Sequence, residues 1–309
     1  MTPLRIAVVD MGSNSLKFSV TGLDETGGPE LLDTAAITVR LGQGVAATGV
    51  IAPDRIDAAL AALVELEQRA RALGACELIG VATAAVRMAS NRQELLARIA
   101  DETSWQVRVI SGDEEAQLTF LGVRSDLPET GSHLIADVGG ASTELVHVVD
   151  GASLFSMSVQ IGSGTLADRW FSSDPPGREL VVAARHDTSN ILAGIGDIDS
   201  AAGSEIHLSG GNGVFLSQVA VWSQIRVPFV VPFLPMLVER LSDVPSREVA
   251  DYLGISQERA RMLPAGGAVA WSLIERVGST GLHAVQSGIG RGVAAAWFAE
   301  RMDNASGAT

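Results

Sequence analysis

The sequence of 309 residues has little cysteine, a single lysine and no long uninterrupted apolar run. Its one cysteine, Cys76, excludes an internal disulfide framework and fits a reducing compartment. The most apolar stretch, Val227–Val238, has 12 residues and three prolines, so we expect no membrane span. The N-terminus has no basic start followed by a cleavage site, so we expect no secretion signal and a cytoplasmic protein.

Basic residues are also scarce, since 22 lysines and arginines stand against 36 acidic residues, for a formal net charge of −14. A chain this acidic is not expected to bind nucleic acid, which requires a basic surface. Hydrophobic residues make up 47% of the chain, which is typical of a globular protein long enough for two domains. The single lysine, Lys17, follows a glycine motif. It either faces a phosphate there, or its position has no functional meaning in a chain that prefers arginine to lysine.

Two segments, Ile6–Phe18 and Leu134–Val146, share one pattern. Each has an apolar β-branched run, then an aspartate, a glycine turn, and hydroxyl or amide residues; the aspartates are Asp10 and Asp137. A strand ending in Asp-x-Gly brings a carboxylate for a metal and the amides of a tight turn for an anion to one point. Two copies indicate a duplicated α/β fold whose half-sites act on a phosphate chain.

Strand-like runs alternate with amphipathic helices in both halves, which predicts a mostly parallel sheet in each. A polar segment at 124–131 marks the expected boundary. We therefore expect one domain over 1–124 and a second over 125–309, with the last helix as a candidate to pack back on the first domain. Further expectations in the second half are a third glycine turn and two successive helices: Ser209–Gly213, Gln257–Leu263 and Leu263–Val277.

Two adjacent glutamates begin a predicted helix after Ser111. With Ser111 as N-cap, Glu114 occupies the capping-box position, and its carboxylate is expected to reach back to the Ser111 amide. Glu115 lies about 100° further around the helix and cannot share that role. It is either a general base that activates water in a cleft or a solvated side chain.

The second glycine turn, at Gly139–Ser142, is followed by Glu144, seven residues after Asp137. Small residues allow the backbone to approach a phosphate closely. A hairpin here would bring Asp137 and Glu144 to one Mg²⁺, which prefers oxygen ligands. An ordinary hairpin with polar tips is the alternative.

Two arginines and five histidines complete the set of candidate side chains. Arg40 and Arg87 each follow a strand-like run, where a planar guanidinium suits either phosphate oxygens or a surface ion pair. The histidines show no metal-ligand spacing and are expected to be structural or exposed: His133, His147, His186, His207 and His283.

Five motifs occur in order along nearly the whole chain: Val9-Asp-Met-Gly-Ser-Asn-Ser, Val39-Arg-Leu-Gly-Gln-Gly, Ala82-Thr-Ala-Ala-Val-Arg, Ile110-Ser-Gly-Asp-Glu-Glu-Ala and Asp137-Val-Gly-Gly-Ala-Ser-Thr-Glu. In this combination they resemble the exopolyphosphatase/guanosine pentaphosphate phosphohydrolase family. The resemblance implies two ribonuclease-H-like α/β domains of the actin, sugar-kinase and Hsp70 superfold, with an active cleft between them. The chain resembles the short form, which lacks the helical C-terminal domain of longer members.

The resemblance also implies an activity and partners. The reaction is Mg²⁺-dependent hydrolysis of terminal phosphoanhydride bonds in inorganic polyphosphate, with Mn²⁺ as an alternative metal. Guanosine pentaphosphate is a further candidate substrate, with a part in the stringent response, and a homodimer is expected. Two alternatives stay open: a non-catalytic sensor that binds polyphosphate or a guanosine alarmone, and a kinase for a small acceptor.

The family pattern also implies roles for single residues. Glu115 matches the base that activates water, and Arg87 matches a phosphate-contacting arginine of the catalytic centre. Asp137 and Glu144 match metal-associated carboxylates, with Asp10 facing them. The candidate phosphate-binding residues are Gly12, Ser13, Asn14, Ser15, Lys17, Arg40, Gly139, Gly140, Ala141 and Ser142.

The chain departs from the family pattern in three places. Ala141 stands where a third glycine is usual, and its methyl group fits if φ is negative there. The Ser209–Gly213 segment differs from the usual Ser-Gly-Thr type, and Ser287–Gly292 lacks an acid and moves an arginine. The departures at Ala141 and Ser287–Gly292 motivate the sensor alternative.

Overall fold

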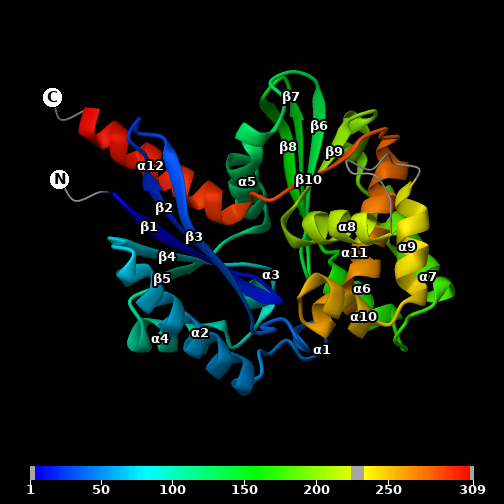
Figure 1. The fold of residues 1–309 in the computed structure, drawn as a ribbon, viewed down its shortest axis with the longest axis horizontal. Helices are drawn as coiled ribbons and strands as arrows, with labels where there is room; N and C mark the ends of the chain where they lie inside the picture. The colour runs from blue at the N-terminus through cyan, green and yellow to red at the C-terminus, as the bar shows by residue number, and fades with distance from the viewer. Residues whose placement is uncertain (1–3, 224–232, 307–309) are drawn as a thin grey trace. The chain divides into compact units, whose positions relative to one another are not determined.

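The computed structural model describes residues 4–223 and 233–306. The chain folds into two compact units. The first comprises Met1–Gly122 with Gly288–Thr309, and the second comprises Val123–Ser287. Each unit contains one five-stranded sheet packed against helices (Figure 1).

In the first unit, β1 (Ile6–Met11), β2 (Ser15–Leu23) and β3 (Pro29–Thr38) form an antiparallel meander. β4 (Glu77–Ala82) pairs in parallel with β1, and β5 (Gln106–Val109) pairs in parallel with β4. The strand order is β3-β2-β1-β4-β5.

The second unit repeats this arrangement with β6 (Ser132–Val138), β7 (Thr143–Val149) and β8 (Ala152–Val159) as the meander. β9 (Glu205–Ser209) pairs in parallel with β6, and β10 (Leu282–Val285) pairs in parallel with β9. The order β10-β9-β6-β7-β8 is the first order in reverse, so the predicted duplicated α/β fold of ribonuclease-H-like type is confirmed.

The prediction of mostly parallel sheets is wrong, because each sheet has two antiparallel and two parallel strand pairs. The first three strands of each unit are joined by short turns, which permit only antiparallel pairing. The later strands follow helical crossovers and pair in parallel.

Helices cover both faces of the first sheet, so alternate residues of β1 enter different cores (Figure 1). Val9 joins the core that includes the buried face of α2 (Pro53–Ala72). Val8 joins a separate cluster with Trp297 of α12 (Ile289–Ser306). The last helix of the chain therefore packs against the first strand.

Glycines allow α12 to lie close to α5 (Gly112–Val123). A Cβ on Gly292 would clash with the carbonyl oxygen of Leu118, and a Cβ on Gly122 would clash with that of Gly288. The glycines of the C-terminal segment that departs from the family pattern thus have a packing role in this unit.

The predicted glycine turn at Ser209–Gly213 is instead the start of α8 (Gly210–Trp222), with Ser209 at the N-cap. A Cβ on Gly213 would clash with the Leu208 carbonyl oxygen, so the absence of a side chain lets this helix turn directly at the end of β9. Glycine usually disfavours a helix, but here the close approach of two backbones requires it.

The two predicted helices, Gln257–Leu263 and Leu263–Val277, form one helix, α11 (Gln257–Val277), with Pro264 inside it. Proline removes one backbone donor and disfavours a helix interior. Pro264 and the residues that follow it are buried in the core of the second unit, and this burial offsets the loss.

Part of the apolar run Val227–Val238 lies outside the described residues, because residues 227–232 are not described. The remainder begins α9 (Phe233–Asp243), in which Leu237 is buried and Met236 is half exposed. Among the described residues, no helix combines the length and the apolarity required to cross a bilayer. The remaining α-helices are α1 (Val45–Thr48), α3 (Ala84–Met88), α4 (Arg92–Glu102), α6 (Ser163–Trp170), α7 (Arg178–Ala193) and α10 (Ser246–Leu253).

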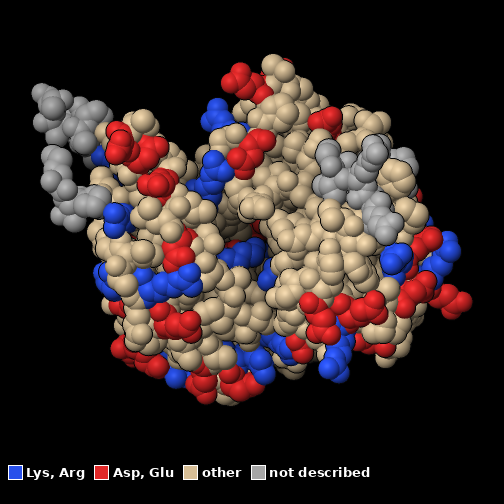
Figure 2. All heavy atoms as spheres, viewed as in Figure 1, with Lys and Arg blue, Asp and Glu red and all other residues tan. Residues whose placement is uncertain are grey.

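Acidic and basic side chains intermingle on the surface. On the face drawn in Figure 2, red and blue side chains lie next to one another over both units. Arg98, for example, pairs with Asp57 at 2.7 Å and with Glu102 at 2.8 Å. Exposed pairs of this kind contribute little to stability.

Candidate active site

The first glycine turn follows β1 and is held by the loop after β3. The Gly12 amide donates to the Ser15 carbonyl at 3.2 Å and closes the turn. The Gly42 amide donates to the Ser13 carbonyl at 2.7 Å, and a Cβ on Gly42 would crowd Ser13. The Ser13 carbonyl of the turn therefore accepts its hydrogen bond from the loop after β3.

Arg40 lies in that supporting loop with a left-handed backbone, at φ 56°. Its amide donates to the Asn14 carbonyl at 2.9 Å. A left-handed conformation is uncommon for a residue with a Cβ and is often found at functional sites. The structure thus joins Arg40 to the turn that carries Ser13 and Asn14.

Lys17 lies beside Asp10, because the β1–β2 ladder places the two residues opposite each other. The distance from Lys17 Nζ to Asp10 Oδ2 is 3.4 Å. Asp10 is buried at 3% exposure, whereas the Lys17 side chain is 43% exposed. The only lysine of the chain therefore has a specific electrostatic partner at the end of β1.

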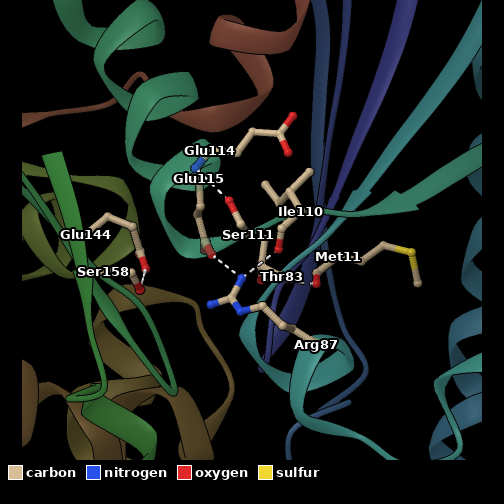
Figure 3. A network of polar contacts seen from close by, with 9 residues as sticks. All are labelled: Met11, Thr83, Arg87, Ile110, Ser111, Glu114, Glu115, Glu144 and Ser158. Atoms are coloured by element: carbon tan, nitrogen blue, oxygen red, sulfur yellow. Dashed lines mark hydrogen bonds and ion pairs between the residues drawn. The ribbon is translucent and has the colours of Figure 1, made fainter.

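Glu115 is buried and is bound to Arg87 (Figure 3). Arg87 Nη1, from α3, donates to Glu115 Oε2 at 3.0 Å and to the Ile110 carbonyl at 2.9 Å. Glu115 is only 5% exposed, so the interpretation of it as a solvated side chain is wrong. Arg87 Nη2 is also buried, and within the described residues it has no hydrogen-bond partner. One arm of the guanidinium holds the carboxylate, and the other is available to an anion.

Glu114, one residue earlier on α5, lies in a different environment. Its amide donates to Ser111 Oγ at 3.1 Å, so the predicted N-cap is confirmed. The predicted reach of its carboxylate back to the Ser111 amide is wrong, because this carboxylate pairs with the Arg108 guanidinium. A charged partner forms the stronger hydrogen bond. Glu114 thus forms an ion pair at the surface, whereas Glu115 forms a buried one.

In the second unit, the β6–β7 hairpin places Asp137 and Glu144 directly opposite each other. Asp137 is 5% exposed and Glu144 is 2% exposed. Ser158 Oγ, from β8, donates to Glu144 Oε1 at 2.8 Å (Figure 3). Facing residues of an antiparallel pair have Cβ atoms about 4.5–5.5 Å apart. Two buried carboxylates at this spacing, with a hydroxyl beside them, are a donor set that suits a hard divalent cation.

The second glycine turn repeats the geometry of the first. The Gly139 amide donates to the Ser142 carbonyl at 2.9 Å, and the Ser163 amide, at the start of α6, donates to the Gly139 carbonyl at 2.8 Å. The amides of Gly140 and Ala141 take part in no hydrogen bond with the described part of the chain. Successive amides left open in this way form a concave anion site.

Ala141 fits this turn without backbone strain. Among the described residues other than glycine, only Arg40 and Asp150 have positive φ, so the condition for a methyl group at Ala141 is met. The Ala141 side chain is buried at 6% exposure. The departure from the family pattern therefore introduces no left-handed backbone at this position.

Asn212 is a positioning residue that had no signal in the sequence beyond its place in a glycine-rich segment. Its Nδ2 donates to the Val138 carbonyl at the end of β6 and approaches Ser163 Oγ at 3.5 Å. Gly266 of α11 leaves room for this side chain, since a Cβ at that position would clash with it. Asn212 thus joins α8 and α6 to the strand that carries Asp137.

The structure therefore forms one half-site in each unit. The first contains the Asp10–Lys17 pair, the Arg87–Glu115 pair and the first glycine turn with its supporting loop. The second contains the Asp137–Glu144 pair and the second glycine turn. On a duplicated ribonuclease-H-like fold, paired carboxylates, a buried oriented glutamate and open amides suit the hydrolysis of phosphoanhydrides.

Comparison with known proteins agrees with this class. Residues 24–299 match the Ppx/GppA phosphatase family, and the chain belongs to that family. Exopolyphosphatase 1 of Mycobacterium leprae (strain TN) is 30% identical over 276 residues, which cover 86% of this chain and 81% of that protein. Exopolyphosphatase 1 of Mycobacterium tuberculosis (strain H37Rv) is 29% identical over 276 residues, covering 86% of this chain and 80% of that protein.

Solved structures show the same fold. The crystal structure of an exopolyphosphatase from Cytophaga hutchinsonii superposes with a TM-score of 0.87 at 25% identity, covering 96% of this chain and 98% of that chain. The Aquifex aeolicus member of the Ppx/GppA family superposes with a TM-score of 0.77 at 23% identity, covering 97% of this chain and 99% of that chain.

Proposed function

We propose that this chain releases orthophosphate from the ends of inorganic polyphosphate in a Mg²⁺-dependent hydrolysis. The observation that carries the proposal is the buried Glu115 carboxylate, which Arg87 Nη1 holds at 3.0 Å while Arg87 Nη2 stays available. A fixed carboxylate next to a free guanidinium arm suits a base that must orient water beside a phosphate. The relatives at 30% and 29% identity are named exopolyphosphatase, which supports the substrate class.

In this mechanism, Glu115 accepts the proton of the attacking water and holds that water in line with the terminal phosphorus. Arg87 fixes the carboxylate and offers its second arm to a phosphate oxygen. The open amides of Gly140 and Ala141 bind oxygens of the phosphate chain. Most of the rate comes from positioning and from charge stabilisation.

Asp137 and Glu144 would hold the metal. Asp10 and Lys17 belong to the half-site of the first unit. Mg²⁺ fits this donor set, because both carboxylates are buried and adjacent and offer only oxygen atoms; Mn²⁺ is the alternative. When bound, the ion neutralises charge on the phosphoryl group. We further propose that each compact unit is a functional domain, and that the protein is a cytoplasmic homodimer.

The deciding experiment is a phosphate-release assay on the purified chain with short polyphosphate, long polyphosphate and guanosine pentaphosphate side by side, with Mg²⁺ and with EDTA. We expect orthophosphate from polyphosphate only with the metal, and the comparison decides whether guanosine pentaphosphate is a second substrate. Tight binding without release would favour the sensor. ATP-dependent labelling of an acceptor without bulk hydrolysis would favour the kinase.

A further inference from the structure

Two histidines and a glutamate meet near the start of the parallel strands of the second unit. His133 lies on β6, and Glu205 and His207 lie on β9. The ladder pairs His133 with Glu205, so all three residues share one face of the sheet. Their ligand atoms lie within 4.8 Å of one another.

The spacing of the two imidazoles fits a metal. His133 Nδ1 and His207 Nε2 are 3.2 Å apart. Two nitrogens bound to one tetrahedral Zn²⁺ at the usual bond length are about 3.3 Å apart. The rings meet edge to face at 73°, so their nitrogens approach without stacking.

The tautomer of His133 is set by its other nitrogen. Nε2 lies 3.0 Å from the Thr130 carbonyl oxygen, which only accepts, so Nε2 carries the proton and Nδ1 presents its lone pair. A backbone carbonyl behind the ring is the usual outer contact of a metal-binding histidine. Without a metal, His207 Nε2–H donates to His133 Nδ1; loading the site requires the His207 proton to move to its Nδ1.

Glu205 contributes a negative charge to the site and connects it to solvent. His133 and His207 are each 4% exposed, while the Glu205 side chain is 47% exposed. His283 of β10 stacks on His207 with ring centroids 4.9 Å apart. Its Nε2 lies 3.3 Å from Glu205 Oε2 and makes no hydrogen bond among the described residues.

We propose that His133, Glu205 and His207 bind one divalent transition-metal ion of the Zn²⁺ type, with water as the fourth ligand. Two imidazoles and a carboxylate suit Zn²⁺, whereas Mg²⁺ prefers oxygen ligands alone. The site is separate from the phosphatase half-site, because Asp137 lies four residues further along β6, about 13 Å away at the rise of a strand. Its role is to fasten β6 to β9, and it does not depend on the proposed hydrolase activity.

The test is a Zn²⁺ titration of the full chain after EDTA treatment, in a large excess of Mg²⁺ that occupies oxygen-only sites. We expect one Zn²⁺ per chain by calorimetry, a rise in Tm, and the visible absorption of tetrahedral Co²⁺ when Co²⁺ replaces Zn²⁺. Absence of saturable binding at one equivalent would overturn the proposal.

Variants assign the ion to these residues. Glu205→Gln keeps the shape of a half-exposed side chain and should weaken Zn²⁺ binding on the order of 100-fold, as should His207→Gln. His186→Gln, at an exposed histidine on α7, is the matched control and should bind like the parent. Asp137→Asn should retain the site. Equal affinity in Glu205→Gln and His186→Gln would reject the assignment, and Glu205→Gln decides even if His207→Gln does not fold.

Discussion

Glu144 lies directly opposite Asp137 on the β6–β7 ladder, at the position that Lys17 holds opposite Asp10 on the β1–β2 ladder. The two hairpins are equivalent elements of the duplicated fold. The first pairs a carboxylate with an ammonium group, whereas the second pairs two buried carboxylates. Of the two hairpins, only the second brings two carboxylates together, and a divalent cation would offset the repulsion between them.

This asymmetry predicts opposite effects of two matched substitutions. Without metal, Asp137→Asn should raise Tm because it removes repulsion with Glu144, and Asp10→Asn should lower Tm because it removes the partner of Lys17. With metal, Asp137→Asn should raise the Mg²⁺ concentration for half-maximal phosphate release by about 10-fold or more. Thermal unfolding with EDTA and with Mg²⁺ checks both statements. Equal shifts of Tm in the two variants would contradict the asymmetry.

Glu115→Gln should lower turnover by about 10²–10⁴-fold while KM changes little, because the amide keeps the shape of the carboxylate but cannot accept the water proton. The neighbouring Glu114→Gln is the matched control, since Glu114 pairs with Arg108 on the surface. Steady-state phosphate release measures both variants. Wild-type turnover in Glu115→Gln would remove the general base from the mechanism.

Arg87→Met should lower the free energy of unfolding on the order of 3 kcal/mol, because it leaves the Glu115 carboxylate buried without its guanidinium partner. Adding Glu115→Gln to this variant should recover part of the loss, without recovering activity. Arg108→Met, which breaks the exposed pair with Glu114, should cost less than about 1 kcal/mol. Urea unfolding compares the variants, and equal losses at the two arginines would show that the buried pair has no special weight.

Gly162→Ala should disturb the second glycine turn. A Cβ on Gly162 would clash with the Gly140 carbonyl and the Ala141 amide, so we expect a loss of about 1–3 kcal/mol together with reduced phosphate release. Gly196→Ala is the control, because no atom lies within 4 Å of the Cβ it would introduce. Unfolding and activity assays on both variants test this, and normal activity in Gly162→Ala would show that the turn tolerates displacement.

Stability should fall as the pH drops below neutrality. Burial lowers the pKa of His207 from 6.5 to about 3, with the charges of His283 and His133 adding to the effect, and burial also lowers the pKa of His147. At pH values between about 3 and 6.5, His207 binds a proton in the unfolded chain but not in the folded chain. The free energy of unfolding therefore falls toward acid by up to about 1.4 kcal/mol per pH unit for His207. Urea unfolding from pH 7.5 to 5 in EDTA measures the slope. His207→Gln should flatten it, and an unchanged slope would contradict the cause.

Short-range relationships were predictable from the sequence. The seven-residue spacing from Asp137 to Glu144 across a glycine turn predicts a hairpin with the two carboxylates side by side, because the register of a hairpin follows from its turn. The glycine segment at Ser209–Gly213 was less informative. Whether such a segment turns or begins a helix depends on how closely Leu208 and Gly213 approach, which local sequence does not contain.

By itself, the sequence determined the alternating strands and helices, the duplication, both glycine turns and the carboxylates that flank them, because each of these rests on local spacing. Only the tertiary structure decided that Glu115 is buried against Arg87, 28 residues away, and that His207 meets His133, 74 residues away. Such contacts form when distant strands and helices pack into one sheet and one core. Spacing along the chain carries no information about them.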